Sequence, residues 1–418
     1  MRFPWHYLLA VAGLLAALLL LAACGGEGEE EATTPTPSPI PTPTATATPT
    51  PSSIPSPTTG QATPTAAPTG GRVPMFRGDP ARSGVNPGPG VERSPTLLWR
   101  FQTDGLVFSS PAVVDGVVYI GSDDKNVYAL DAATGEERWR FETTGWVGGS
   151  PAVAEGAVYI GSAGFLRGLY NVYGLDADTG EQRWRFHAGN EIWSSPAVVD
   201  GVVYIGSDDS HVYALDGVTR EEIWSFKADY WFRSSPAVVD GVVYIGSLDS
   251  RVYALDAATG EERWRFQTGD RVGSSPAVVD GVVYIGSDDS HVYALEAATG
   301  EERWRFQTSG AVGSSPAVTD GVVYVGSDDS HVYALDAATG EERWRFQTGD
   351  SVGSSPTVVD GVVYIGSQDS YVYALDAATG EERWRFQTGD RVRSSPAVVD
   401  GVVYIGSYDG YVYAITEE

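Results

Sequence analysis

The chain has 418 residues and a formal net charge of −28 at pH 7, with 55 acidic side chains against 27 Lys and Arg. A negative field of this size repels nucleic acids and anionic membrane surfaces, so the sequence excludes a polyanionic partner. Its one cysteine, Cys24, excludes disulfides and cysteine-based metal sites within the chain.

The first predicted element is an export signal over residues 1–23. Arg2 is the single Lys or Arg in it, the 16 residues 8–23 are almost wholly apolar, and Leu-Ala-Ala-Cys closes the run at Cys24. A membrane span needs about 20 apolar residues, so an uncleaved anchor is disfavoured, although an ordinary signal peptide stays open. The ending resembles a bacterial lipobox, which implies cleavage before Cys24 and lipidation of that cysteine. We therefore expect an extracytoplasmic protein that is lipid-anchored to a bacterial membrane.

Residues 24–72 form the second predicted region. An acidic patch leads into a long alternation of Pro with Thr or Ser, which holds too few apolar residues to bury a core and favours extended, polyproline-like backbone. At ~3.1 Å per residue, such a region reaches on the order of 145 Å when fully extended. We expect a disordered stalk that holds the following domain away from the membrane.

Residues 73–418 are predicted to form one repeat domain. The phrase Ser-Ser-Pro-Ala-Val-Val-Asp-Gly, or a close variant, recurs every 40 residues with one interval of 45, so that its proline lies at Pro111, Pro151, Pro196, Pro236, Pro276, Pro316, Pro356 and Pro396. Each copy divides into four short strands, with an Asp-Gly hairpin turn after the first. Four strands in a repeat of about 40–45 residues are typical of a propeller blade.

The number of strands predicts how the ring closes. There are eight copies of the first strand, but the chain ends after the third strand of the eighth copy, and a fourth strand at residues 96–103 precedes the first copy. We therefore predict an all-β, eight-bladed β-propeller of four-stranded antiparallel blades. Residues 97–102 should pair with residues 412–415, so that the N-terminal strand completes the C-terminal blade.

A motif between the third and fourth strands carries a family resemblance. One copy reads Ala334, Asp336, Thr339, Gly340 and Trp344. These residues resemble the tryptophan-docking motif of the PQQ-like repeat, which builds quinoprotein dehydrogenases and BamB-like propeller lipoproteins of outer-membrane β-barrel assembly. The resemblance covers about residues 97–418, and three copies depart from it, at Gly174, Arg220 and Glu296. It implies that one tryptophan per blade docks against the next blade, at Trp99, Trp139, Trp184, Trp224, Trp264, Trp304, Trp344 and Trp384.

The resemblance leaves an enzymatic and a non-enzymatic function open. Quinone-dependent dehydrogenases of the family use a catalytic Asp, a calcium ion and often a disulfide between adjacent cysteines. The propeller here contains no cysteine, and its Asp residues recur before Gly in nearly every copy, as Asp280 does, which indicates turn chemistry rather than an asymmetric site. We expect no enzymatic activity, no catalytic residues and no cofactor.

Two further motifs raise the question of metal binding. The Ser-Asp-Asp-Ser turns at residues 207–210, 287–290 and 327–330 lack the glycine and the distal glutamate of an EF-hand loop, so we expect solvated hairpin turns. The histidines that follow them, His211, His291 and His331, fall in different blades, where convergence on one ion is disfavoured. We expect no metal site.

The copies differ from one another at the entry to the first strand, and such differences indicate a specialised surface in an otherwise uniform chain. The positions three and five residues before each repeat proline lie beside the central channel, and several copies place aromatic or Arg side chains there, the types that protein and glycan surfaces favour. The same region contains one insertion, at residues 163–171. We predict a partner-binding face formed by Phe108, Trp146, Trp193, Tyr230, Trp231, Phe232, Arg233, Arg271, Arg391 and Arg393. The alternative is drift among duplicated repeats, with the aromatic rings packing across the channel mouth.

Residues 73–94, which are rich in Pro and Gly, are predicted to form an extended strap over the propeller surface. The Arg-Gly-Asp triplet within them, residues 77–79, is too short a match to support integrin binding. A stalk, a rigid ring and no recognisable chemistry lead us to expect a monomeric scaffold that binds another protein. The alternatives are binding of a surface or wall glycan and a BamB-like role in outer-membrane protein assembly.

Overall fold

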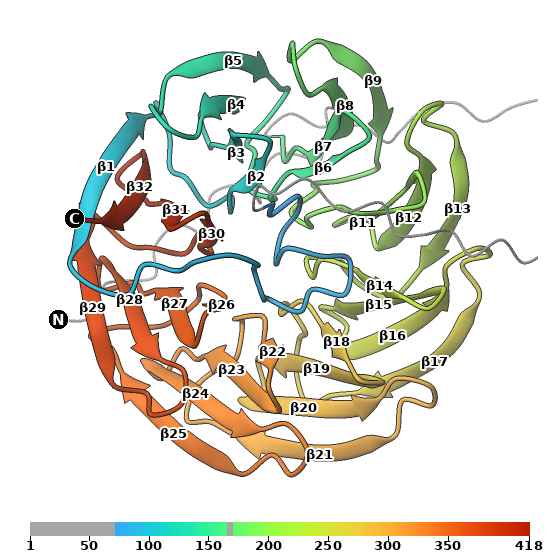
Figure 1. Cartoon of the computed structure of the whole chain (residues 1–418). Helices are drawn as coiled ribbons and strands as arrows, with labels where there is room; N and C mark the ends of the chain where they lie inside the picture. Colours follow the sequence, from blue (N-terminus) through green and yellow to red (C-terminus); the bar gives the residue numbers. More distant parts are fainter. Residues whose placement is uncertain (1–71, 165–169) are drawn as a thin grey trace, which may run out of the picture. The chain divides into compact units, whose positions relative to one another are not determined.

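The computed structural model describes residues 72–164 and 170–418, which belong to one compact unit. The predicted signal peptide, the lipidated Cys24 and the stalk up to residue 71 lie outside the described residues. Within the described ranges, no helix is long and apolar enough to cross a membrane. Thirty-two strands form eight four-stranded sheets there, arranged as blades around a central channel (Figure 1). The predicted eight-bladed propeller is confirmed.

The inner half of each blade is made of two short strands. The innermost strands have three residues each and are β2 (Ala112–Val114), β6 (Ala152–Ala154), β10 (Ala197–Val199), β14 (Ala237–Val239), β18 (Ala277–Val279), β22 (Ala317–Thr319), β26 (Thr357–Val359) and β30 (Ala397–Val399). The second strands are β3 (Val117–Gly121), β7 (Ala157–Gly161), β11 (Val202–Gly206), β15 (Val242–Ser247), β19 (Val282–Ser287), β23 (Val322–Gly326), β27 (Val362–Gly366) and β31 (Val402–Gly406).

The outer half of each blade is made of two longer strands. The third strands are β4 (Asn126–Asp131), β8 (Asn171–Asp176), β12 (His211–Asp216), β16 (Arg251–Asp256), β20 (His291–Glu296), β24 (His331–Asp336), β28 (Tyr371–Asp376) and β32 (Tyr411–Glu417). The outer strands are β5 (Glu137–Glu142), β9 (Gln182–His187), β13 (Glu222–Lys227), β17 (Glu262–Gln267), β21 (Glu302–Gln307), β25 (Glu342–Gln347), β29 (Glu382–Gln387) and β1 (Pro95–Gln102). We number the blades 1 to 8 from β2; blade 8 combines β30, β31 and β32 with β1.

The first turn of each blade follows from its Asp-Gly pair. Asp280 and Gly281 both have positive φ, 50° and 73°, which is the backbone of the type I′ turns that suit two-residue hairpins. Behind this turn, Val278 pairs with Val283 in an antiparallel register. The hairpin predicted from the sequence is therefore confirmed.

The ring closes as predicted, by pairing of the two ends of the domain. β1 lies antiparallel to β32, with Leu97 opposite Ile415 and Phe101 opposite Val412. Blade 8 has no turn between its third and outer strands, because these belong to different ends of the chain. Val91, which precedes β1, replaces the missing turn: its carbonyl accepts a hydrogen bond from the indole nitrogen of Trp384 at 2.8 Å.

The eight predicted docking tryptophans each join one blade to the next. The indole nitrogen of Trp304, for example, donates to the carbonyl of Ala337 in the following blade at 2.9 Å. The ring lies against Gly340, where a Cβ would come within 2.7 Å of it and where φ is +75°. Both facts favour glycine at this position of the motif, although Arg220 occupies it in one copy with a φ of 65°. The remaining tryptophans make the same bond, to Ala132, Ala177, Gly217, Ala257, Ala297, Ala377 and Val91.

The aspartate of the docking motif stabilises the turn. Asp336 accepts hydrogen bonds from the amides of Ala338 and Thr339 through Oδ1, and its Oδ2 pairs with Arg343 at 2.8 Å. The ion pair with Arg343, followed by the Thr339 amide, lowers the pKa of Asp336 to about 2. This carboxylate is already engaged by its own repeat, as turn chemistry predicts.

A closed ring of serines links the innermost strands. The amide of the serine before each repeat proline donates to the hydroxyl of the same serine in the next blade, at 2.9 to 3.0 Å. The last bond runs from Ser395 of blade 8 to Ser110 of blade 1, so the circle has no free end. The repeat therefore keeps this serine for the geometry of the channel wall.

The predicted strap over the propeller surface is wrong in its position. Residues 73–86 lie at the centre of the ring, in blue in Figure 1, and bond to the innermost strands. Only residues 87–91, of which 87–89 are exposed, run outward from the centre to the rim over blades 7 and 8. Arg77 of the Arg-Gly-Asp triplet is 5% exposed, and its guanidinium donates to the carbonyls of Pro316 and Pro356. The triplet is part of the channel filling, which rules out recognition of its arginine from outside.

Candidate functional site

The candidate site lies where two kinds of loop meet at each junction between blades. One is the loop before an innermost strand, and the other is the turn between the second and third strands of the preceding blade. Main-chain bonds join them in a repeated pattern: the amide of Phe232 donates to the carbonyl of Ser207 at 3.0 Å, and that of Val272 to the carbonyl of Ser247 at 3.0 Å. Because the backbone is held by these bonds, the side chains there can differ between blades without changing the fold.

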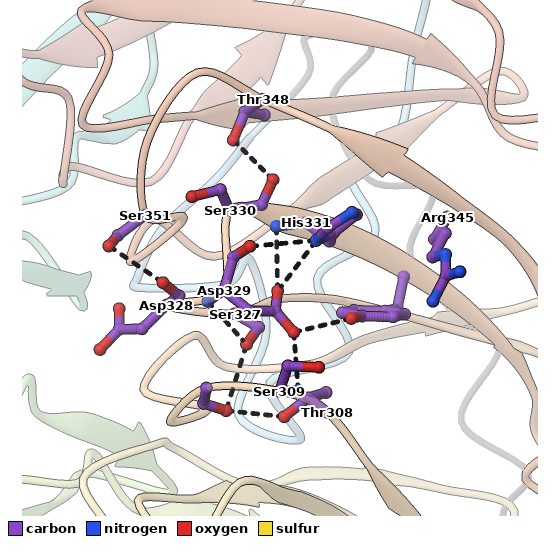
Figure 2. Close-up of polar contacts among 12 residues, drawn as sticks. Thr308, Ser309, Ser327, Asp328, Asp329, Ser330, His331, Arg345, Thr348 and Ser351 are labelled. Carbon is purple, nitrogen blue, oxygen red and sulfur yellow. Dashed lines mark hydrogen bonds and ion pairs between the residues drawn. The ribbon is translucent and has the colours of Figure 1, made fainter.

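The Ser-Asp-Asp-Ser turn is rigid for a structural reason. Figure 2 shows Asp329 between His331 and Ser309, whose amides donate to its Oδ1 and Oδ2 at 3.1 and 2.8 Å. Oδ2 also accepts the hydroxyl of Tyr333 at 2.7 Å. The ring nitrogen Nδ1 of His331 lies 3.0 Å from the Asp329 carbonyl. Among the residues that the structure describes, no group of three or more His, Cys, Asp or Glu is placed to hold a metal ion.

An ion pair at the junction of blades 3 and 4 is the centre of the site. Arg233, before β14, donates through Nη2 and Nε to Asp208, at 2.7 and 3.1 Å. The Asp208 side chain is 1% exposed, whereas that of Arg233 is 40% exposed. Burial raises the pKa of Asp208, and its hydrogen bond with Arg233 opposes that shift. The arginine therefore compensates a buried carboxylate while presenting one face to solvent.

Aromatic rings surround this arginine. Its guanidinium carbon lies 5.1 Å from the ring centre of Trp231 and 5.7 Å from that of Trp193, within the range of cation–π attraction. Tyr230 stacks on Trp231 with ring centres 4.8 Å apart, and Trp146 of the neighbouring loop lies 6.4 Å from Trp193. We call Trp146, Trp193, Tyr230, Trp231 and Arg233 the aromatic–arginine cluster.

The structure places the other predicted residues apart from this cluster. Phe108 packs against Tyr408, with ring centres 4.3 Å apart, at the junction of blades 8 and 1. Arg271, Arg391 and Arg393 are exposed and belong to the loops of blades 5 and 8. The sequence prediction thus combined one continuous cluster with separate side chains of other blades.

Phe232 is a wrong prediction. Its side chain is fully buried in the core between blades 3 and 4, and its ring lies 5.9 Å from that of Tyr253. The position four residues before the repeat proline is apolar in every copy, and its side chain points inward, as those of Val272 and Val312 do. Comparison of the copies at this position was the signal that would have excluded it.

Three residues of the site were missed from the sequence: Glu191, Asp208 and Tyr408. Glu191 accepts the indole N–H of Trp193 at 2.9 Å. The other two occupy the first position of the turn after the second strand, which also varies around the ring, as Asp123, Ala163, Asp208, Leu248, Asp288, Asp328, Gln368 and Tyr408. The tertiary structure pairs this position with the one three residues before the next repeat proline.

The junction of blades 1 and 2 shows what happens without an arginine. Gly148 stands there opposite Asp123, whose buried Oδ1 has no hydrogen-bond partner among the described residues. Burial, with a smaller contribution from Asp124, raises the pKa of Asp123 to about 6. Gly148 has another role, because a Cβ on it would lie 2.5 Å from the ring of Trp193. This glycine makes room for the cluster.

We therefore expect Gly148→Ala to displace Trp193 and change the cluster without unfolding the ring. The matched control is Gly313→Ala, at the equivalent position of blade 6, where an added Cβ meets nothing within 4 Å. Tryptophan fluorescence and the melting temperature measure the two effects. A spectrum of Gly148→Ala that matches that of Gly313→Ala would contradict the contact.

Comparison with known proteins supports the fold and assigns a family. The model of the family described as outer membrane protein assembly factor BamB matches four times, over residues 91–190, 170–271, 248–352 and 328–418. No curated protein sequence matches at a significant level.

Solved structures share the architecture at low identity. BamB from Moraxella catarrhalis is 20% identical, with 77% of this chain and 99% of that chain covered and a TM-score of 0.68. A quinohemoprotein alcohol dehydrogenase from Comamonas testosteroni is 17% identical, covering 82% and 80%, with a TM-score of 0.70. The computationally designed Ika8 protein is 18% identical, covering 78% and 100%, with a TM-score of 0.69. Since the family matches extend over most of the chain, it belongs to the family of the outer membrane protein assembly factor BamB.

Proposed function

We propose that the protein is a non-enzymatic, extracytoplasmic scaffold that binds another protein through the aromatic–arginine cluster. The observation that carries this proposal is the cluster itself: four aromatic rings and a half-exposed arginine gathered from three adjacent loops of an otherwise uniform ring. Trp, Tyr and Arg are the residues that most often dominate the binding energy of protein interfaces. A surface glycan is the alternative ligand, since aromatic faces also suit sugars.

The experiment is to capture partners from the envelope fraction of the source cell and to probe a glycan array in parallel. We expect Trp231→Ala to weaken protein capture at least tenfold, because truncation of an interface anchor costs about 2 kcal/mol or more. The melting temperature should change little, since Trp231 is only partly buried and its main-chain bond to Leu248 remains. Ser351→Ala, at the equivalent position of blade 7, is the control. Equal capture by both variants would place the partner elsewhere.

Assembly of outer-membrane proteins is the second candidate function, and the family match favours it. The family takes its name from an outer membrane protein assembly factor, and the propeller fold is shared. The same capture experiment separates the two readings, because recovery of an outer-membrane assembly component would support this role over that of a general scaffold.

We propose that the propeller does not catalyse quinone-dependent oxidation. The support is the state of its carboxylates: the aspartate of the docking motif is engaged by its own turn and arginine, as Asp336 is, and the propeller contains no cysteine. Titration with pyrroloquinoline quinone and calcium, followed by dye-linked oxidation of alcohols and sugars, should give no turnover. Measurable turnover would overturn this part of the proposal.

We also propose that the mature chain begins at a lipid-modified Cys24. The support is the lipobox-like sequence and membership of the BamB family. Mass spectrometry of the N-terminal peptide should show a diacylglyceryl cysteine, and Cys24→Ala should leave the membrane fraction after processing. An unmodified Cys24 in the membrane fraction would contradict the proposal.

A further inference from the structure

Residues 72–91, which we call the strap, bind to the propeller as an extended peptide binds to a receptor: residues 73–86 contact the channel wall, and residues 87–91 continue outward over blades 7 and 8. The amide of the middle residue of six innermost strands donates to a strap carbonyl at 2.7 to 2.9 Å, in blades 1, 2, 4, 5, 6 and 7. Blade 8 is reached through Asn86, whose Nδ2 donates to Val398 at 3.3 Å. Blade 3 is reached through Arg82, so all eight blades take part.

Two arginines fill the channel. Arg82 is fully buried and donates through Nε to the Pro236 carbonyl at 3.0 Å and through Nη2 to the Ser195 and Pro196 carbonyls, each at 3.0 Å. Arg77 donates to the corresponding prolines of blades 6 and 7. The acceptors in the channel wall are therefore the carbonyls of the repeat's own prolines and, in blade 3, of the serine before the proline. A ring of carbonyl oxygens suits the flat, five-donor guanidinium.

The strap has little structure of its own. Its internal main-chain bonds run from Gly78 to Met75, Arg82 to Asp79 and Gly84 to Arg77, and side-chain bonds within it involve Asp79 with Ser83 and Arg82 with the Phe76 carbonyl. None of these forms a helix or a hairpin, and most of its other bonds go to the propeller. Val73, Met75 and Val91 are each buried, and they belong to three different cores of the ring. Its conformation is thus imposed by the channel wall.

We propose that the channel is a binding site for an extended, arginine-containing peptide, and that residues 72–91 are its resident ligand, which the site also accepts in trans from a second copy of the chain. This site is independent of the aromatic–arginine cluster, because it uses the inner edges of the blades and main-chain acceptors. The arginine pair supplies its specificity, and the glycines and prolines between them supply the extended path.

The test separates the strap from the ring within the full chain. A protease site is inserted between the exposed Arg93 and Ser94, and the purified protein is cleaved. The strap then belongs to the N-terminal fragment, and only its noncovalent contacts hold this fragment to the propeller. We therefore expect both fragments to elute together. A fluorescent peptide of residues 72–91 is added in excess, both to the native cleaved protein and during refolding from denaturant. Uptake of the label into the propeller peak, with loss of the N-terminal fragment, is the expected result.

Peptide variants supply the specificity control. The peptide with Arg77→Ala and Arg82→Ala should compete at least 100-fold more weakly, since several charge-assisted bonds are lost. The Arg72→Ala peptide should compete within about threefold, because its ion pair with Asp115 is solvent-exposed. Absence of label uptake in both protocols, or equal competition by the double alanine peptide, would overturn the proposal.

Discussion

Replacing Pro95–Gln102 with Gly and Ser of the same length is expected to open the ring and lower the melting temperature by more than 10 °C. The change removes β1 and with it the pairing to β32 and the buried Trp99. Loss of a buried tryptophan alone costs about 3–5 kcal/mol, and loss of the β1–β32 pairing adds to this cost. The melting temperature of a domain of about 150–250 residues falls by roughly 2–4 °C per kcal/mol, and that of this larger propeller by somewhat less. Thermal unfolding followed by circular dichroism measures the effect.

Replacement is better than deletion because β1 also connects two distant points. Residues 94 and 103 flank a strand of about 27 Å, so a deletion would pull the strap out of the channel as well. The matched control is the same replacement in β21 (Glu302–Gln307), the outer strand of blade 5, which leaves the ring closed. An equal fall in melting temperature for both variants would show that β1 contributes no more than any other outer strand and does not close the ring.

The second large effect is expected from Arg233→Ala, which should destabilise the propeller by about 3 kcal/mol at pH 7. The substitution leaves the Asp208 carboxylate buried without its cation. Breaking a buried pair from one side typically costs about 3–5 kcal/mol, and the half-exposed arginine places this pair at the lower end. Denaturant titration measures the loss, and Asp208→Asn in the same chain should restore most of it. The partner-binding test therefore uses Trp231→Ala alone.

The destabilisation should depend on pH with a defined sign. The pKa of Asp208 in the folded protein is raised above 3.8 by burial, and removing Arg233 removes the hydrogen bond that opposes this rise. The folded state then binds more protons than the unfolded state above pH 3.8, so stability falls as the pH rises through that window. The loss of unfolding free energy in Arg233→Ala relative to the parent should be largest at pH 7 and should decrease toward pH 4. Trp231→Ala, which leaves the ion pair of Arg233 with Asp208 in place, should show no such dependence.

Much of the fold could be predicted because its signals are local and repeated. The Asp-Gly pair specifies its turn by backbone conformation alone, and the Thr-Gly and Trp of the docking motif recur at fixed spacing in almost every blade. The ring closure needed only a count of strands, since a fourth strand without a blade must pair with a blade that lacks one. Local hydrogen bonding decides such features, and the sequence displays it directly.

The site and the strap depended on contacts that only the closed ring creates. Arg233 and Asp208 lie 25 residues apart on different loops and meet because adjacent blades bring these loops together. Gly148 serves Trp193 across another junction, and it cannot be distinguished from Gly313 in the sequence. From the sequence, Arg77 and Arg82 are expected on the surface, in a Pro- and Gly-rich segment. In the ring, they donate to the carbonyls of the repeat prolines that face the channel, while strap carbonyls accept the amides of the innermost strands. The sequence by itself determined the strands of a blade, the number of blades and the closure of the ring. The tertiary structure decided which side chains face one another across junctions and which residues fill the centre. Those partners are set by the geometry of the ring and not by spacing along the chain.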